Sequence, residues 1–205
     1  WAWAFHKIDS FFAVFCEKNH LQPLELCLSE KGRSIPYLRF GQGEETILLT
    51  SRHHACESTG NYILEGILDE LMKKPIEGYS VICVPFVDYD GVVDGDQGKN
   101  RYPHDHNRDY EADTPAIYAS VAAIRKYIAE ENVAFGFDFH APFHSGGVRD
   151  TCFIVQKSKK DLENEILADY IIKYYKKYKQ ELGYRAMTDR INRDNNEHYN
   201  DKQVY

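Results

Sequence analysis

The most constraining feature of this 205-residue sequence is a series of short apolar runs that alternate with helical patterns. Residues 46–50 (TILLT), 81–86 (VICVPF) and 134–139 (AFGFDF) are each of strand length. The first two are continuous apolar runs, which are typical of strands buried on both faces of a sheet. Helical patterns at residues 59–73 and 114–130 separate them. The sequence therefore predicts an α/β fold with a mixed, largely parallel central sheet flanked by helices.

The flanking segments complete this prediction. In chain order they are a helix at 9–19, strands at 24–28 and 34–40, a strand at 152–156 and a helix at 161–182. Asp9 or Ser10 is the predicted N-cap of the first helix. Gly32 lies in the hairpin turn between the first two strands. Thr114 is predicted to open the helix at 114–130, with Pro115 in its first turn.

Composition excludes several classes of function. The net charge of -7 argues against nucleic acid as the main partner, because phosphate binding needs a basic face. No apolar run is long enough to span a bilayer, and the first residues do not resemble a signal peptide. The five cysteines are scattered without a CxxC pair, which predicts neither a disulfide framework nor an all-cysteine zinc site. Unpaired thiols favour a cytoplasmic location.

The length fits one domain that spans residues 1–205. The predicted strands make a sheet that looks incomplete at its C-terminal end. We therefore expect a single catalytic domain that is truncated at its C-terminus.

Two polar clusters directly follow predicted buried strands. His54 and Glu57 form an H-x-x-E pair after residues 46–50, and His140 closes the strand at 134–139. Ligands bind beyond the carboxyl ends of strands in such sheets, and two histidines with a glutamate make a catalytic zinc site. Taken singly, Glu57 could instead stabilise a helix N-terminus electrostatically. Each histidine could be an ordinary loop or strand-end residue. His53 is a rival for His54, but its spacing to Glu57 does not fit the motif.

A third cluster lies in the polar segment between residues 88 and 113. Its Asp and Gly residues could be turn formers, although a loop of this length is more often functional. Arg101 and Arg108 could pair with Asp105 and Asp109 at the surface. Alternatively, these guanidinium groups could bind a substrate carboxylate, for which arginine offers a bidentate match.

Together these motifs resemble the zinc metallocarboxypeptidase family. The order is H-x-x-E, a turn at Asp88-Tyr89-Asp90-Gly91, Arg101, the segment Asp105-His106-Asn107-Arg108 and Asp138-Phe139-His140. The resemblance is closest to the branch that includes cytosolic carboxypeptidases, although the turn departs from the Asn-Pro that begins it there. It covers roughly residues 45 to 145 and implies the zinc carboxypeptidase-like (phosphorylase/hydrolase-like) fold.

The resemblance also implies roles for matched residues. His54, Glu57 and His140 would bind Zn²⁺, and Asp105 would be the carboxylate that orients His54. A zinc-bound histidine usually donates its other N–H to such a group. The open fourth position of the zinc would hold a water whose pKa falls to about 7.

The substrate-binding roles come from the same resemblance. Asn107 and Arg108 would hold the terminal carboxylate of the substrate, and Arg101 would stabilise the oxyanion. The family also needs a general-base glutamate C-terminal to the third ligand. Glu181 and Glu197 are the candidates considered, and neither fits, since one lies in a predicted helix and the other in a polar stretch.

Three hypotheses for function follow. The first is a zinc carboxypeptidase that acts on a peptide or peptide-like substrate with a free carboxylate. The second is an N-acyl amino acid amidohydrolase of the aspartoacylase and succinylglutamate desuccinylase type, which shares these motifs. The third is a non-catalytic module that retains zinc or carboxylate binding without the base.

Overall fold

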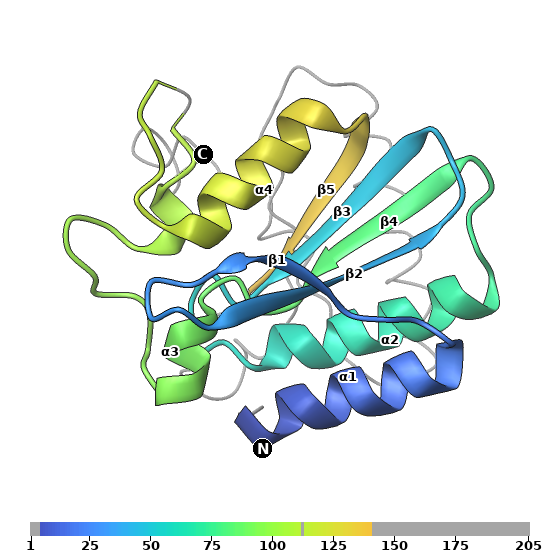
Figure 1. Cartoon of the computed structure of the whole chain (residues 1–205), viewed down its shortest axis with the longest axis horizontal. Coiled ribbons are helices and arrows are strands. Elements are labelled where there is room, and N and C mark those ends of the chain that lie inside the picture. Colours follow the sequence, from blue (N-terminus) through green and yellow to red (C-terminus); the bar gives the residue numbers. More distant parts are fainter. Residues whose placement is uncertain (1–4, 112, 141–205) are drawn as a thin grey trace, which may run out of the picture. The chain divides into compact units, whose positions relative to one another are not determined.

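A mixed five-stranded β-sheet organises the part of the chain that the computed structural model describes, residues 5–111 and 113–140. The strands lie in the order β1-β2-β4-β3-β5 (Figure 1). The elements are α1 (Phe5–Asn19), β1 (Leu24–Leu28), β2 (Ser34–Gly41), β3 (Glu45–Ser51), α2 (Thr59–Lys73), β4 (Tyr79–Val84), α3 (Tyr89–Asp94), the 3₁₀ turn η1 (His106–Arg108), α4 (Ala119–Glu130) and β5 (Val133–Phe139).

The strands β4, β3 and β5 are parallel to one another, whereas β2 runs antiparallel to β4 and β1 antiparallel to β2. This confirms the predicted α/β class and the mixed sheet. The hairpin is also confirmed, with Gly32 at a φ of 72° in its turn, where the absence of a Cβ removes the strain. Because β3 and β5 are parallel neighbours in which Ser51 is in register with Phe139, both strands end at the same edge.

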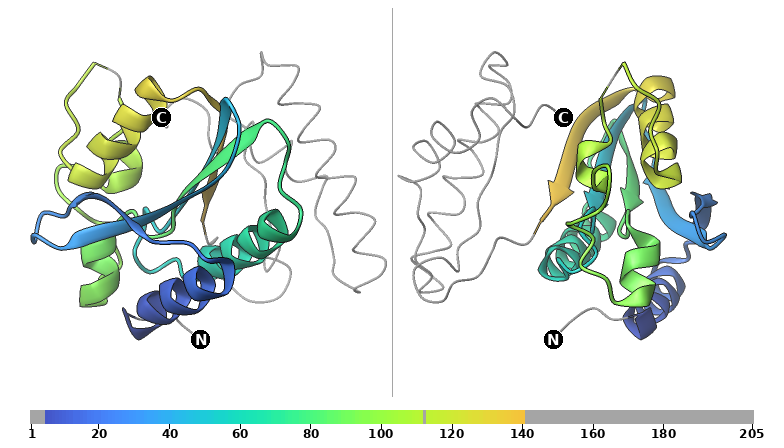
Figure 2. Two further views of the ribbon diagram at one scale, coloured as in Figure 1. Left: turned by 45° about the vertical axis from the view of Figure 1, so that its right-hand side comes forward. Right: turned by 90° about the vertical axis from the view of Figure 1, so that its left-hand side faces the viewer.

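Alternating residues of the central strands supply two cores, one on each face of the sheet. On one face, Ile47 and Leu49 pack with α1 and α2, whose buried contributors include Leu64 and Leu68. On the other face, Leu48 packs against α4. Figure 2 shows α2 and α4 on opposite sides of the sheet when it is viewed along its edge. Burial on both faces explains why β3 and β4 read as continuous apolar runs.

Two predicted helix starts are wrong. The helix α1 begins at Phe5, so Asp9 and Ser10 lie within it; no glycine or proline in residues 5–8 stops the helix there. The helix α4 begins at Ala119 instead of Thr114. The backbone N–H groups that open it find remote carboxylates: Tyr118 donates to Asp109 at 2.9 Å, and Ala119 to Glu30 at 2.7 Å.

The segment at 88–113 is more regular than predicted, because α3 and η1 lie within it. The expected turn at Asp88-Tyr89-Asp90-Gly91 is the start of α3. The carboxylate of Asp88 is its N-cap and accepts a hydrogen bond from the N–H of Gly91 at 2.9 Å. An aspartate at this position satisfies an N–H group that would otherwise lack a partner.

Several predictions fall outside the described residues: the strand at 152–156, the helix at 161–182 and the C-terminal extent of the domain. Among the helices that the structure describes, none combines the length and apolar character needed to cross a membrane.

Candidate metal centre

The end of β3 turns sharply into the site. Arg52 has a φ of 63°, a value that is uncommon for a residue other than glycine. Its buried side chain holds this conformation, because Nε donates to the carbonyl of Ala55 at 2.7 Å and a terminal nitrogen to Asn61 Oδ1 at 3.0 Å. The turn therefore places the two following histidines, His53 and His54, just beyond the C-terminal end of β3, in the loop that leads to α2.

A glycine lets α2 approach the end of β5. A Cβ on Gly60 would lie 2.7 Å from the carbonyl oxygen of Phe139 and 2.9 Å from the hydroxyl of Ser51, closer than side chains tolerate. The first turn of α2 thus packs directly on the ends of β3 and β5. This contact brings Glu57, which precedes α2, to the residue that follows β5, His140.

The three predicted metal ligands lie together. The Nδ1 atom of His54 is 3.0 Å from one carboxylate oxygen of Glu57, and the Nδ1 atom of His140 is 2.7 Å from the other. One ligand atom from each residue lies within 4.8 Å of the others. Glu57 is only 6 % exposed, so its carboxylate is held between the two rings.

Each ring presents its second nitrogen to another carboxylate. His54 Nε2 lies 3.5 Å from Asp105, and His140 Nε2 lies 2.5 Å from Asp138. Metal-bound histidines usually have such a partner, which fixes the tautomer and the ring orientation. The donor set of two imidazoles and one carboxylate, with Nδ1 facing inward on both rings, fits zinc.

Hydrogen bonds to Glu57 set the charge of the site. Burial would raise the pKa of Glu57, but hydrogen bonds from His140, His54 and Lys99 outweigh it and hold that pKa well below its usual range. Burial would likewise lower the pKa of His140, yet its bonds to Asp138 and Glu57 raise it to about 10. The carboxylate of Glu57 is therefore ionised and faces the cations of His140 and Lys99, which a divalent cation could replace.

Asp138 links His140 to a second, buried histidine. Its other oxygen lies 2.9 Å from His53 Nδ1, and the hydroxyl of Tyr110 lies 2.7 Å from His53 Nε2. Thr50 also donates to Asp138, at 3.0 Å. His53, Asp138 and His140 could form an alternative metal-binding group. Because Asp138 already bonds both rings, the chain of contacts is better explained as support for His140.

The support of His140 by Asp138 was not predicted from the sequence, although a signal was present. Residues i and i+2 of a strand project to the same side, which places Asp138 beside His140. The contribution of His53 and Tyr110 had no such local signal, because both reach Asp138 only through the folded chain.

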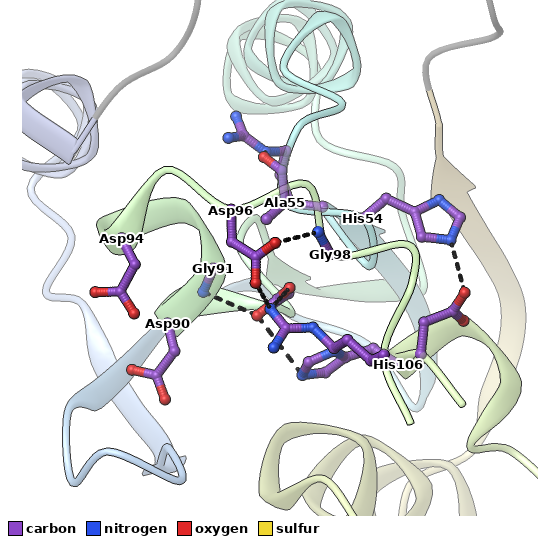
Figure 3. Close-up of polar contacts among 12 residues, drawn as sticks. His54, Ala55, Asp90, Gly91, Asp94, Asp96, Gly98 and His106 are labelled. Atoms are coloured by element: carbon purple, nitrogen blue, oxygen red, sulfur yellow. Dashed lines mark hydrogen bonds and ion pairs between the residues drawn. The ribbon is translucent and has the colours of Figure 1, made fainter. Parts of the chain in front are cut away.

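Arg101 lies in a second cluster, around the start of α3. Its guanidinium contacts Asp88 at 2.6 Å and Asp96 at 3.0 Å. Figure 3 shows this cluster, in which the N–H of Gly98 also donates to Asp96, at 3.1 Å. A Cβ on Gly91 would meet Asp88 at 2.5 Å, so the cluster is packed closely. The structure therefore gives Arg101 two carboxylate partners.

The turn η1 carries the predicted substrate-binding residues. Arg108 donates to the buried Asp105 at 2.7 Å, through the same carboxylate oxygen that faces His54, while 52 % of its side chain stays exposed. Asn107 is buried beside it. Asp105 thus joins the candidate metal ligand His54 to Arg108. Both Asn107 and Arg108 remain predictions for carboxylate binding.

His106 plays a structural part that the sequence did not reveal. Its ring stacks on Tyr118 with centroids 3.7 Å apart. Burial, aided by the nearby positive charge of Arg101, lowers the pKa of His106 to about 3. The imidazole is therefore neutral at physiological pH.

Comparison with known proteins agrees with the motifs. No family model matches the chain. Cytosolic carboxypeptidase 2 of Xenopus tropicalis is 25% identical over 134 residues, which cover 56% of this chain and 14% of that protein. This match confirms the resemblance to the zinc carboxypeptidases.

Solved structures support the fold. A metallo-carboxypeptidase from Burkholderia cenocepacia superposes with a TM-score of 0.60 at 21% identity, over 74% of this chain and 43% of that one. A metallo-carboxypeptidase from Pseudomonas aeruginosa, in complex with (2-guanidinoethylmercapto)succinic acid, has a TM-score of 0.54 at 17% identity, over 69% and 40%. These matches confirm a carboxypeptidase-like fold, and the chain spans less than half the length of each protein.

Proposed function

We propose that this chain provides the metal-binding half of a zinc-dependent carboxypeptidase, which removes a C-terminal residue from a peptide or peptide-like substrate. The observation that carries the proposal is the convergence of His54 and His140 on Glu57, with each ring held from behind by a carboxylate. The similarity to a cytosolic carboxypeptidase and the shared fold support it.

A bound zinc ion would act as a Lewis acid and lower the pKa of a bound water to about 7. The protein residues would orient the reacting groups. Asp105 and Asp138 hold the two imidazoles, so that the Nδ1 atoms face Glu57. Preorganised ligands avoid a cost of reorganisation during the reaction.

A substrate carboxylate would bind beside this centre. Arg108 keeps half of its side chain exposed although it is anchored to Asp105, so part of its guanidinium faces solvent. A planar guanidinium can bind a carboxylate through two parallel hydrogen bonds. The Pseudomonas enzyme binds a succinic acid derivative, which agrees with carboxylate recognition at this fold. We propose that Asn107 and Arg108 hold the terminal carboxylate.

The general base that this reaction needs is not assigned among the residues that the structure describes. Glu181 and Glu197, the candidates from the sequence, lie outside them. The proposal therefore concerns metal and substrate binding by this chain, and the reaction requires a base in addition.

Zinc content tests the proposal directly. Elemental analysis of the purified protein should find about one zinc per chain in the wild type and much less in His140→Ala. The matched control is His20→Asn, because His20 is exposed and asparagine tolerates its positive φ of 55°. Failure of the folded wild type to take up zinc after reconstitution would refute the proposed metal site.

A substrate panel separates the activities that such a site could support. We expect release of the last residue from N-blocked dipeptides and C-terminal peptides. Preferred cleavage of N-acyl amino acids would instead indicate an amidohydrolase. Zinc binding without either activity would indicate a binding module.

A further inference from the structure

The hairpin between β1 and β2 is bonded to α3 through a buried carboxylate. Asp90, in the first turn of α3, is only 8 % exposed. It accepts hydrogen bonds from the hydroxyl of Ser29 at 2.9 Å and from the backbone N–H of Lys31 at 3.1 Å. Arg33 Nη1 donates to the same carboxylate at 2.9 Å. All three donors lie in the turn between β1 and β2, so this one carboxylate fixes the hairpin to α3.

Arg33 also bonds a second carboxylate of α3. Its other terminal nitrogen, Nη2, donates to Asp94 at 2.9 Å, and Lys31 pairs with Asp94 as well. Asp90 and Asp94 are four residues apart, and Figure 3 shows both on α3. A planar guanidinium holds two carboxylates in a more fixed geometry than a flexible ammonium does. Arg33 therefore restrains the movement of α3 relative to the hairpin.

The first turn of α3 also lies against Arg101. Asp88, the N-cap of α3, contacts Arg101 Nη2 at 2.6 Å. A Cβ on Gly91 would lie 2.7 Å from this nitrogen and 2.7 Å from the Cβ of Ala55, which stands in the loop between two candidate metal ligands. Since contacts this close leave no free space, a shift of α3 would move the guanidinium.

These contacts leave Arg101 with donors for a substrate. Both of its ion pairs, with Asp88 and with Asp96, use Nη2, whereas a guanidinium has five N–H donors. The ion pairs therefore aim the group without using it up, which agrees with the oxyanion role expected for Arg101. A donor of this kind is effective only where it is held at the position at which charge develops.

We propose that Arg33 is a positioning residue for Arg101. It would act through its two carboxylate partners on α3, whose N-cap Asp88 contacts the guanidinium. The hairpin would thus set the place of the oxyanion donor, although it lies in a different part of the sequence. This inference deepens the proposed function and rests on it for the catalytic role of Arg101. The contacts between Arg33 and Arg101 themselves involve no metal ligand.

Hydrogen exchange of the Arg101 side chain tests the inference without zinc or substrate. Its Nε atom is buried, so the Nε–H signal in a nitrogen-15 NMR spectrum should exchange slowly with water; the signal is identified by its loss in Arg101→Lys. Arg33→Met should speed this exchange by about 5-fold, while backbone amides of β4 keep their wild-type rates. Arg33→Lys should recover part of the protection.

The matched control is Arg39→Met. Arg39 lies on β2, and its guanidinium bonds Glu131 through two nitrogens and not α3. This variant should leave the exchange of the Arg101 signal unchanged. Unchanged exchange in folded Arg33→Met would overturn the inference. An equal acceleration at Arg101 and in β4 would also overturn it, because that result indicates a loss of overall stability.

Kinetics of the zinc-loaded protein give a second readout. With a blocked dipeptide, Arg33→Met should lower kcat by about 10-fold and change KM by less than about 2-fold, because a displaced donor costs transition-state stabilisation. Zinc affinity, measured by competition with a chromophoric chelator, should stay at the wild-type value. In an Arg101→Lys background, Arg33→Met should have little further effect on kcat.

Fully additive losses of kcat in the double variant would contradict action through Arg101. A wild type that binds no zinc, or that cleaves no substrate when loaded, would instead refute the proposed function. Hydrogen exchange of Arg101 would still decide whether Arg33 positions this side chain, so the two failures are distinguishable.

Discussion

At the scale of single residues, the site is defined by which atom of each histidine faces which carboxylate. Both rings turn Nδ1 toward Glu57 and Nε2 toward an aspartate. The aspartates therefore set the ring orientation, and their removal should affect the metal before it affects the fold.

Asp138→Asn should weaken zinc binding by roughly 10- to 100-fold, the usual cost of losing a carboxylate partner of a ligating histidine. The same chelator competition measures the dissociation constant. Asp113→Asn, at an exposed position, is the matched control. Equal zinc affinity in Asp138→Asn and the wild type would show that Asp138 does not position His140.

Arg108→Ala should raise KM for a C-terminal peptide by about 10- to 100-fold while zinc content stays at the wild-type level, because a charged hydrogen bond to the substrate is lost. Lys126→Ala, at an exposed position on α4, serves as the control. Loss of zinc together with activity would assign Arg108 a structural role through Asp105 instead.

His106 should make the protein less stable in mild acid. Its folded pKa of about 3 lies below the value of about 6.5 expected in the unfolded chain, so the unfolded state binds more protons between these values. The contribution of the neutral His106 ring to the free energy of unfolding is complete above about pH 6.5 and falls as the pH drops toward 3. We expect a loss of about 2 kcal/mol between pH 7.5 and 5.

Urea unfolding in excess chelator at both pH values measures this loss. The comparison is with His106→Phe, which keeps the stacking on Tyr118 but cannot titrate. If the free energy of unfolding has the same pH dependence in both proteins, His106 is not the group responsible.

At the scale of elements, contacts distant in sequence decide where helices begin. The buried carboxylate of Asp109 accepts hydrogen bonds from the N–H groups of Ile117 and Tyr118, and it also contacts His104 at 2.8 Å. These bonds fix the start of α4, whose buried side covers one face of the sheet.

Asp109→Ala should lower the free energy of unfolding by about 2–3 kcal/mol, because it leaves the N–H groups of Ile117 and Tyr118, directly before α4, without their acceptor. Chemical denaturation measures the change, with Asp113→Ala as the exposed control. A loss below about 0.5 kcal/mol would mean that the start of α4 does not depend on Asp109.

At the scale of the whole molecule, the candidate metal centre joins chain segments that are far apart in sequence. Glu57 precedes α2, whereas His140 follows β5, and the two are 83 residues apart. A metal bound by both would therefore stabilise the folded chain, in which alone they meet.

Zinc at a free concentration about 100-fold above its dissociation constant should add about 2.7 kcal/mol to the free energy of unfolding. Calorimetry should accordingly show a melting temperature several degrees higher with zinc than with chelator. His140→Ala should lose this difference. A wild-type melting temperature that is indifferent to zinc would argue against a site that links Glu57 to β5.

The sequence by itself predicted the strands, the hairpin and the helix α2, because their signals are local. The apolar run at 46–50 records burial on both faces, and the 3.6-residue period of α2 needs no knowledge of its neighbours. The motifs also predicted that His54, Glu57 and His140 would meet, because they resemble those of a known family and ligands bind beyond the carboxyl ends of strands. The structure brings the three together, and their role in binding zinc stays a prediction.

Only the tertiary structure decided which charges pair. Lys99 and Arg101 are two residues apart and equally positive, yet one reaches Glu57 and the other is held by Asp88 and Asp96. The start of α4 likewise depends on Asp109. The physical reason is that ion pairs and helix caps act through space over a few ångströms, and the distances that select among equivalent charges exist only in the folded chain.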